Sequence, residues 1–323
     1  DLLRYLPDEP LLKPLDRELE NRLTAWFDVG FLELQRITWQ SPAALLEKLV
    51  QYEAVHEIRS WDDLKNRLDS DRRCYAFFHP RMPLEPLIFV QVALVDTLAD
   101  DVQKLLDINA PLADANRATT AIFYSISATQ DGLRGVSFGN FLLKRVVEDL
   151  QRDFPKLKTF STLSPIPGLM SWVRRNPADA AGVFTEADRK RLVAAGVEGD
   201  GDLEGEGESL GTRLSGDGRW ATDKALALAL RDTLLRLAAH YLLNARRDGK
   251  PVDPVARFHL GNGARVERLN WLADTSPKGF DQSLGIMVNY LYDPERIENN
   301  VEAFSSDGEV DAAAAVRRMA RQP

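Results

Sequence analysis

The sequence has a single cysteine, Cys74, in 323 residues. One cysteine cannot form a disulfide within the chain, and it excludes zinc or iron–sulfur sites built from several cysteines. Long apolar runs are also missing, because none approaches the roughly 20 residues that cross a bilayer. The first residues, DLLRYLPDEPLL, show neither the pattern of a secretory signal nor an initiator methionine. We therefore expect a cytoplasmic protein with no membrane partner, and we expect further sequence before residue 1.

Basic residues are fewer than acidic residues. The chain has 41 lysines and arginines against 49 aspartates and glutamates, which gives a net charge of −8. Proteins that follow a nucleic-acid backbone normally carry a basic patch, so we expect no nucleic-acid partner. Only four histidines are present, and no two of them have the spacing of helical metal ligands. We therefore expect no metal site.

The remaining composition predicts two parts. Hydrophobic residues make up 44% of the chain, which is enough for one large domain and a smaller one. Residues 1–70 place apolar side chains at steps of three and four, the helical period, and Ser60 followed by acidic residues resembles a helix start. From Cys74 onward, short β-rich runs alternate with amphipathic segments. We predict an α+β fold with a small all-helical domain over residues 1–70 and a mixed α/β domain over residues 71–323.

The second part contains a regular series of expected elements. Strands are expected at residues 74–80, 86–96, 118–127, 157–163, 256–260 and 285–293, and helices at 98–107, 136–154, 168–175, 221–247 and 312–322. The first two strands are joined by a turn-like segment and are expected to pair. The strand, helix and strand between residues 118 and 163 have the order of a βαβ unit with parallel strands.

The turn from Gln130 to Asn140 is a candidate phosphate site. It follows a strand and opens a helix, so it leaves backbone N–H groups unpaired at the positive end of a helix dipole. Residues 134–139 resemble the acetyl-CoA signature R/Q-x-x-G-x-G/A of GNAT-like acetyltransferases, with Ser137 in place of the first glycine. Short glycine patterns are common, and the alternative is a strand-to-helix turn relieved by glycine.

Ser164 and His259 are the candidate catalytic residues. Ser164 lies in TLSPIPG between a strand and a helix, without the G-x-S-x-G pattern of a nucleophile elbow. The alternative role for Ser164 is to cap the following helix. His259 precedes Gly261-Asn262-Gly263, where a sharp bend would expose the ring at a strand end for acid–base chemistry. The alternative for His259 is a structural role.

Four blocks of the sequence resemble malonyl-CoA decarboxylases: RRCYAFFHP, SISATQDGLRGVSFGNFLLKRVV, FSTLSPIPG and ARFHLGNGA. The resemblance extends from WFDVGFLELQRITWQSP to MVNYLYD, nearly the whole chain. It implies a helical N-terminal domain used in oligomer contacts, a GNAT-like catalytic domain that binds a CoA thioester, and a homo-oligomer, either a dimer or a tetramer. The implied reaction converts malonyl-CoA to acetyl-CoA and carbon dioxide without a cofactor.

The resemblance also implies roles for individual residues. Ser164 would be the proton acceptor and His259 the proton donor, and both would contact the substrate. The residues implied to hold CoA are Arg134, Gly135, Val136, Ser137, Phe138, Gly139 and Asn140, and the candidates for further contacts are Gln130, Asn262 and Tyr290. Animal members of the family carry a glutamate at the position of Ser137, so any role of that carboxylate does not transfer.

Two other functions remain open. A CoA-dependent acyltransferase would use the same fold and phosphate loop, and a non-catalytic CoA-binding protein would be favoured if Ser164 and His259 were far apart. Among decarboxylase substrates, methylmalonyl-CoA is also open, because an apolar pocket discriminates weakly against one added methyl group.

Overall fold

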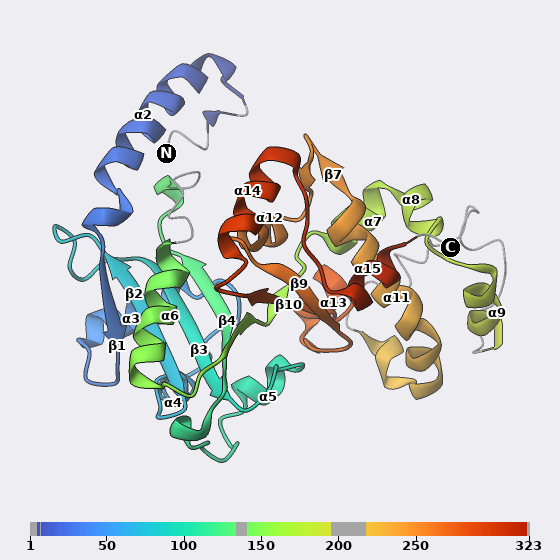
Figure 1. The fold of residues 1–323 in the computed structure, drawn as a ribbon, viewed down its shortest axis with the longest axis horizontal. Helices are drawn as coiled ribbons and strands as arrows, with labels where there is room; N and C mark the ends of the chain where they lie inside the picture. Colours follow the sequence, from blue (N-terminus) through green and yellow to red (C-terminus); the bar gives the residue numbers. More distant parts are fainter. Residues whose placement is uncertain (1–4, 7, 134–140, 195–217, 322–323) are drawn as a thin grey trace. The chain divides into compact units, whose positions relative to one another are not determined.

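The computed structural model describes residues 5–6, 8–133, 141–194 and 218–321. Its internal contacts divide the chain into two compact units, each considered by itself below (Figure 1). Unit 1 comprises Asp1–Asp96 and Ile108–Lys158, and unit 2 comprises Thr97–Asp107 and Thr159–Pro323. No helix in these described ranges is both long enough and apolar enough to cross a membrane.

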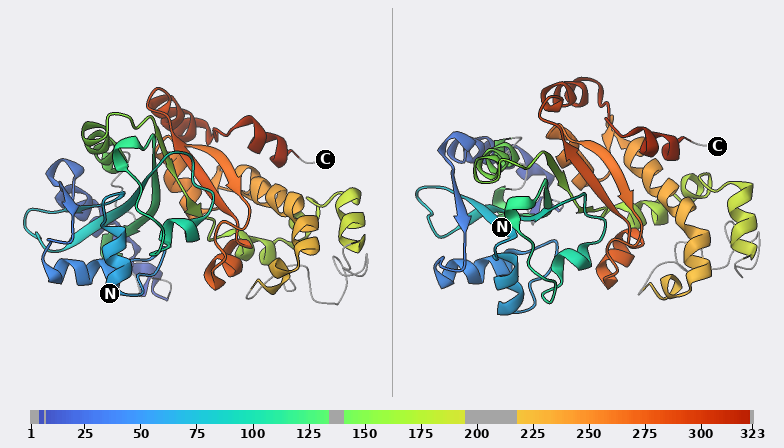
Figure 2. Two further views of the ribbon diagram at one scale, coloured as in Figure 1. Left: turned by 90° about the horizontal axis from the view of Figure 1, so that it is seen from below. Right: turned by 60° about the horizontal axis from the view of Figure 1, so that its bottom comes forward.

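Unit 1 is built on four antiparallel strands in the order β1-β2-β3-β4. The strands are β1 (Glu33–Ile37), β2 (Arg72–Phe78), β3 (Pro86–Val95) and β4 (Thr120–Ala128). Its α-helices are α2 (Lys13–Trp26), α3 (Ala43–Tyr52), α4 (Trp61–Arg67) and α6 (Phe141–Asp153), and its short 3-10 turns are Pro10–Leu12, Val29–Phe31, Ala115–Arg117 and Asp131–Leu133. Figure 2 shows α6 on one face of this sheet and α3 and α4 on the opposite face.

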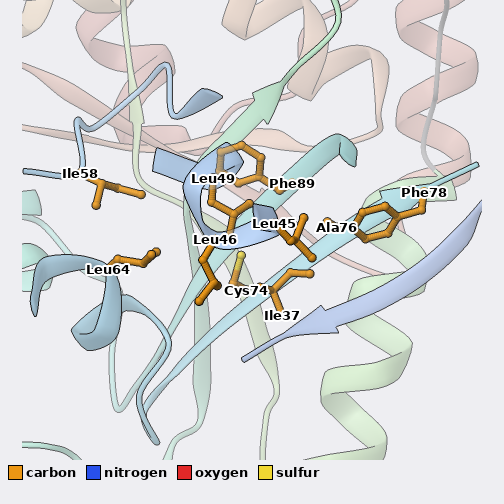
Figure 3. Close-up of a cluster of buried hydrophobic side chains, with 10 residues drawn as sticks. All are labelled: Ile37, Leu45, Leu46, Leu49, Ile58, Leu64, Cys74, Ala76, Phe78 and Phe89. Carbon is orange, nitrogen blue, oxygen red and sulfur yellow. The ribbon is translucent and has the colours of Figure 1, made fainter. Parts of the chain in front are cut away.

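The core of unit 1 follows from its two central strands. β2 is buried along its whole length and β3 along all but its last residue, as expected of strands covered on both faces. Figure 3 shows a hydrophobic cluster in which α3 and these two strands are joined by residues of β1, of α4 and of the segment between α3 and α4; its members are Ile37, Leu45, Leu46, Leu49, Ile58, Leu64, Cys74, Ala76, Phe78 and Phe89. The only cysteine of the chain is therefore a buried core residue.

Unit 2 centres on strand β10 (Met287–Tyr292). On one side β10 pairs antiparallel with β9 (Arg265–Asn270), and on the other with β5 (Thr159–Thr162) and β6 (Ser164–Pro165) in succession. A separate two-stranded sheet joins β7 (Arg246–Arg247) to β8 (Lys250–Pro251). The α-helices are α5 (Val102–Leu106), α7 (Leu169–Arg175), α8 (Pro177–Ala181), α9 (Glu186–Ala194), α11 (Lys224–Asn244), α12 (Pro254–Gly261), α13 (Pro277–Ser283), α14 (Ile297–Asp307) and α15 (Ala314–Ala320), with a 3-10 turn at Arg219–Thr222.

Most of the expected elements are present, and the mixed α/β fold class is confirmed. The expected strands at 74–80 and 86–96 form an antiparallel pair, and Ser60 caps α4 by accepting a hydrogen bond from the Asp63 N–H. The other confirmed elements are the strands at 118–127, 157–163 and 285–293 and the helices at 98–107, 168–175, 221–247 and 312–322. The helix expected at 136–154 is confirmed from Phe141 onward. The parallel pairing of the expected βαβ unit stays a prediction.

Residues 1–70 are not entirely helical. The helix predicted from the apolar period ends at Trp26, and Glu33–Ile37 forms strand β1, which pairs with β2 across five registered positions. The hydrogen bonds and side-chain packing that β1 gains by pairing with β2 outweigh the helical preference of its local sequence, because strand preference depends on the surrounding fold. A separate oligomerisation domain over residues 1–70 stays a prediction.

The segment ARFHL is a helix and not the predicted strand. It lies in α12, which begins with Asp253 as N-cap and Pro254 at the first helical position. Both are strong helix-start signals, and they precede the five residues on which the strand prediction was based. His259 therefore lies in the last turn of a helix.

Candidate functional site

Ser164 and His259 meet within unit 2, although they are 95 positions apart in the chain. Ser164 lies on β6, where it pairs with Val288 of β10, and its side chain is buried. The distance from Ser164 Oγ to His259 Nε2 is 3.2 Å, and Ser164 Oγ donates a hydrogen bond to Thr162 Oγ1 at 2.8 Å. The following helix, α7, has Gly168 as its N-cap, so the alternative that Ser164 caps this helix is wrong.

The end of α12 positions His259. Asn262 is the C-cap, and Gly263 follows with φ of +81°, a conformation that favours glycine. A side-chain carbon at Gly263 would lie 2.6 Å from the carbonyl oxygen of Ile297, so glycine is required for space as well. The glycine-bearing motif after His259 is therefore a helix stop, which lets the chain turn from α12 into β9.

Two tyrosines of β10 hold the imidazole ring. Tyr290 stacks on His259 with ring centroids 4.6 Å apart and an interplanar angle of 25°. The Tyr292 hydroxyl lies 2.7 Å from His259 Nδ1. Residues i and i+2 of a strand share one face, which is why both tyrosines reach the same ring. The sequence prediction included Tyr290 but missed Tyr292, although alternation along a predicted strand could have indicated it.

Burial sets the charge state of these groups. His259 is 3% exposed, and burial lowers its pKa from 6.5 to about 3. Burial also raises the pKa of Tyr292 and of Tyr290 well above the usual value for a phenol. At neutral pH the site therefore contains a neutral imidazole between a neutral phenol and a neutral hydroxyl group.

This arrangement differs from a serine protease triad. In a triad, a carboxylate at Nδ1 stabilises the imidazolium that forms when histidine takes the serine proton. Here Nδ1 faces the Tyr292 hydroxyl, and no carboxylate contacts the ring among the described residues. The geometry thus supports hydrogen bonding and proton relay by neutral groups more than activation of Ser164 as a nucleophile.

The other candidate residues have varied positions. Asn262 and Tyr290 each have a buried polar atom, Nδ2 and the hydroxyl oxygen respectively, without a hydrogen-bond partner among the described residues. Gln130 belongs to unit 1, where its Nε2 donates to Glu85 Oε1 and Thr129 Oγ1. The predicted CoA loop, Arg134–Asn140, lies outside the described residues. Within those residues, no group of three or more His, Cys, Asp or Glu side chains could hold a metal ion.

Three contributors were absent from the sequence prediction: Thr162, Asp253 and Tyr292. Thr162 Oγ1 accepts hydrogen bonds from Ser164 and from the Tyr290 N–H. Asp253 caps the helix that carries His259. The capping role was readable from Asp253-Pro254, whereas the contacts of Thr162 require the pairing of β5 and β6 with β10.

Comparison with known proteins gives consistent matches along the chain. The family model described as the malonyl-CoA decarboxylase C-terminal domain matches residues 30–323. Mitochondrial malonyl-CoA decarboxylase of Anser anser anser is 41% identical, and the match covers 98% of this chain and 63% of that protein. The enzyme of Rattus norvegicus is 40% identical, with 98% and 65% covered. The chain thus spans slightly less than two thirds of the length of these relatives.

Solved structures give the same match. The crystal structure of malonyl-CoA decarboxylase from Rhodopseudomonas palustris is similar with a TM-score of 0.85 and 46% identity, covering 98% of this chain and 73% of that one. The corresponding structure from Cupriavidus metallidurans has a TM-score of 0.80 and 51% identity, covering 99% and 75%.

Proposed function

Because the chain belongs to the malonyl-CoA decarboxylase family, we propose that it converts malonyl-CoA to acetyl-CoA and carbon dioxide with Ser164 and His259 as its proton-handling pair. The observation that carries this proposal is the contact between the two side chains, 3.2 Å from oxygen to nitrogen in a buried site. A non-catalytic role would have been favoured by a large separation of the two residues. We further propose that residues 134–140 bind the CoA phosphates and that the active protein is a homo-oligomer.

The substrate supplies its own electron sink. When the carbon–carboxylate bond breaks, its electron pair moves onto the thioester as an enolate, and the α-carbon then takes a proton. The protein must hold the carboxylate perpendicular to the thioester plane, place donors at the enolate oxygen and deliver that proton. No pyridoxal, thiamine or biotin is needed for these steps, so we propose that the reaction is independent of a cofactor.

A neutral His259 suits the donor role. We assign the tautomer in which the Tyr292 hydroxyl donates to Nδ1, so that Nε2 carries the proton and points toward Ser164 Oγ. Ser164 in turn donates to Thr162, which gives one continuous direction of donation from Tyr292 to Thr162. With substrate bound, the Nε2–H group donates its hydrogen bond to the enolate oxygen, and the Ser164 hydroxyl relays to the α-carbon a proton that is replaced from solvent. Neutral imidazole acts in this way as an electrophile in triosephosphate isomerase.

Acyl transfer is the competing reaction. Transfer to an amine requires a base that removes the amine proton, and a histidine whose pKa is lowered to about 3 is a poor base at neutral pH. A covalent malonyl-serine is also disfavoured. Its formation would require His259 to take the Ser164 proton, and no carboxylate among the described residues contacts the ring to stabilise the resulting imidazolium.

The test measures acetyl-CoA formation from malonyl-CoA by the purified protein without added cofactor. We expect His259→Asn and Ser164→Ala to lose at least about 100-fold in kcat, since removal of one preorganised donor typically costs 10²–10³-fold. Matched controls are Ser283→Ala, a buried serine whose hydroxyl donates to Ile286 O, and His240→Asn, a half-buried histidine on α11. Both controls should retain wild-type turnover.

The same preparation separates the alternatives. Methylmalonyl-CoA tests the substrate, and acetyl-CoA with an amine acceptor tests acyl transfer. A folded protein that binds CoA, leaves malonyl-CoA intact and acetylates the amine would replace decarboxylation with acyl transfer.

A further inference from the structure

Asp253 connects the two segments that carry Ser164 and His259. Its side chain is fully buried. One carboxylate oxygen, Oδ1, accepts hydrogen bonds from the N–H groups of Val255 and Ala256, each at 2.9 Å, and so caps α12. The other oxygen, Oδ2, accepts a hydrogen bond from the Gly168 N–H at 3.2 Å. One carboxylate therefore holds the start of the His259 helix and a residue four positions after Ser164.

The contact at Gly168 is closely packed. The Tyr241 hydroxyl donates to Asp253 Oδ2 at 3.4 Å and covers Gly168, where a side-chain carbon would lie only 2.1 Å from the Tyr241 oxygen. Gly168 has a negative φ of −92°, with ψ of −12°, which is open to residues other than glycine, so lack of space and not backbone conformation requires glycine here. Gly168, the last residue of SPIPG, is thus packed closely against Asp253 and Tyr241.

Removal of the carboxylate would release both segments. Ser164 and His259 share no helix or strand, and their 3.2 Å contact depends on how β6 lies against α12. A displacement of about 1 Å between reacting groups can cost 100-fold in rate. Burial raises the pKa of Asp253, while the N–H donors and Tyr241 oppose that increase, as expected of a carboxylate that takes part in several hydrogen bonds.

We propose that Asp253 is a positioning residue for the reaction, which sets the contact between Ser164 and His259 by linking the N-terminus of α12 to Gly168. This inference rests on the proposed function for its kinetic test. Asparagine is the most selective replacement, because its oxygen can still accept the hydrogen bonds that cap α12. Its NH₂ group would then face the Gly168 N–H, and two donors cannot form a hydrogen bond with each other. Asp253→Asn should therefore keep the helix and lose the link.

The kinetic test compares Asp253→Asn with Asp223→Asn. Asp223 caps α11 through the same pair of backbone bonds, to Ala225 and Leu226, but it has no link to the Ser164 segment. We expect Asp253→Asn to lower kcat for malonyl-CoA by about 10- to 100-fold with KM changed less than about threefold, and Asp223→Asn to change neither. Equal kinetics in the two variants would overturn the proposal.

Two further comparisons separate positioning from a general loss of stability. In a Ser164→Ala background, Asp253→Asn should cost less than about twofold in kcat, because the contact that it sets is already absent; a full additional loss would contradict the proposal. Gly168→Ala should also lower kcat, because the added carbon would lie against the Tyr241 hydroxyl and Asp253 Oδ2 and would displace the residue that Asp253 holds. Wild-type kcat in Gly168→Ala would also count against the proposal.

A readout without turnover keeps this inference distinct from the proposed function. The ¹⁵N signal of His259 Nε2 reports its hydrogen bond to Ser164. It should move in Asp253→Asn toward its position in Ser164→Ala, and it should stay unchanged in Asp223→Asn. If the wild type does not decarboxylate malonyl-CoA, the proposed function fails, while this shift still decides the role of Asp253. An unmoved signal in Asp253→Asn would refute that role.

Discussion

The buried neutral histidine predicts a specific loss of stability in acid. The folded protein holds His259 with a pKa of about 3, against 6.5 for the exposed group. Above pH 6.5 both the folded and the unfolded chain carry this ring neutral, so its contribution does not vary. Between pH 6.5 and 3 the unfolded chain binds a proton that the folded chain does not, so the free energy of unfolding falls as the pH falls. From pH 7.5 to 4.5 this linkage costs about 2.5 kcal/mol.

The assay is urea unfolding at pH 7.5 and 4.5 for the wild type and for His259→Asn. Carboxylates titrate in both proteins and cancel in the comparison, which isolates the histidine. We expect the acid-induced loss in the wild type to exceed that in the variant by about 2.5 kcal/mol, because asparagine does not titrate. Equal losses in the two proteins would refute the reasoning, since they would mean that the ring is protonated in the folded state near pH 6.5.

Three other substitutions test separate parts of the account. Tyr292→Phe removes the partner of His259 Nδ1 and should lower kcat for malonyl-CoA about tenfold, equivalent to about 1.4 kcal/mol, with KM nearly unchanged; an unchanged kcat would exclude this tautomer-setting role. Gly263→Ala places a carbon against Ile297 at φ of +81° and should lower both the free energy of unfolding, by about 1–3 kcal/mol, and kcat, measured by urea unfolding and by turnover. Ser60→Ala removes the cap of α4 and should cost about 1 kcal/mol in urea unfolding while kcat stays at the wild-type value.

Local sequence patterns predict the two central residues of the site but not the element that carries one of them. Short blocks that resemble a known family predict Ser164 and His259 as site residues, and the folded chain brings their side chains into contact. The apolar pattern of ARFHL by itself predicts a strand, whereas the segment forms the helix that carries His259. Asp253-Pro254 was available in the sequence and would have given the correct element.

Other contacts depend on pairing between distant segments. Thr162 reaches Tyr290 because β5 and β6 lie beside β10, more than 120 positions later in the chain. Strand β1 is likewise defined by its partner β2, since its own residues have a helical period. The link from Asp253 to Gly168 joins residues 85 positions apart. Such contacts are specified only by the folded chain, so local patterns could not predict them.

The central claim is that this chain removes carbon dioxide from malonyl-CoA and protonates the resulting enolate by means of Ser164 and His259. The most direct measurement is mass spectrometry of the products formed from malonyl-CoA in D₂O. The account predicts acetyl-CoA with one deuterium from solvent on the methyl group, and at least about 100-fold slower formation by His259→Asn and Ser164→Ala. A folded wild type that binds CoA and leaves malonyl-CoA unchanged would contradict the account.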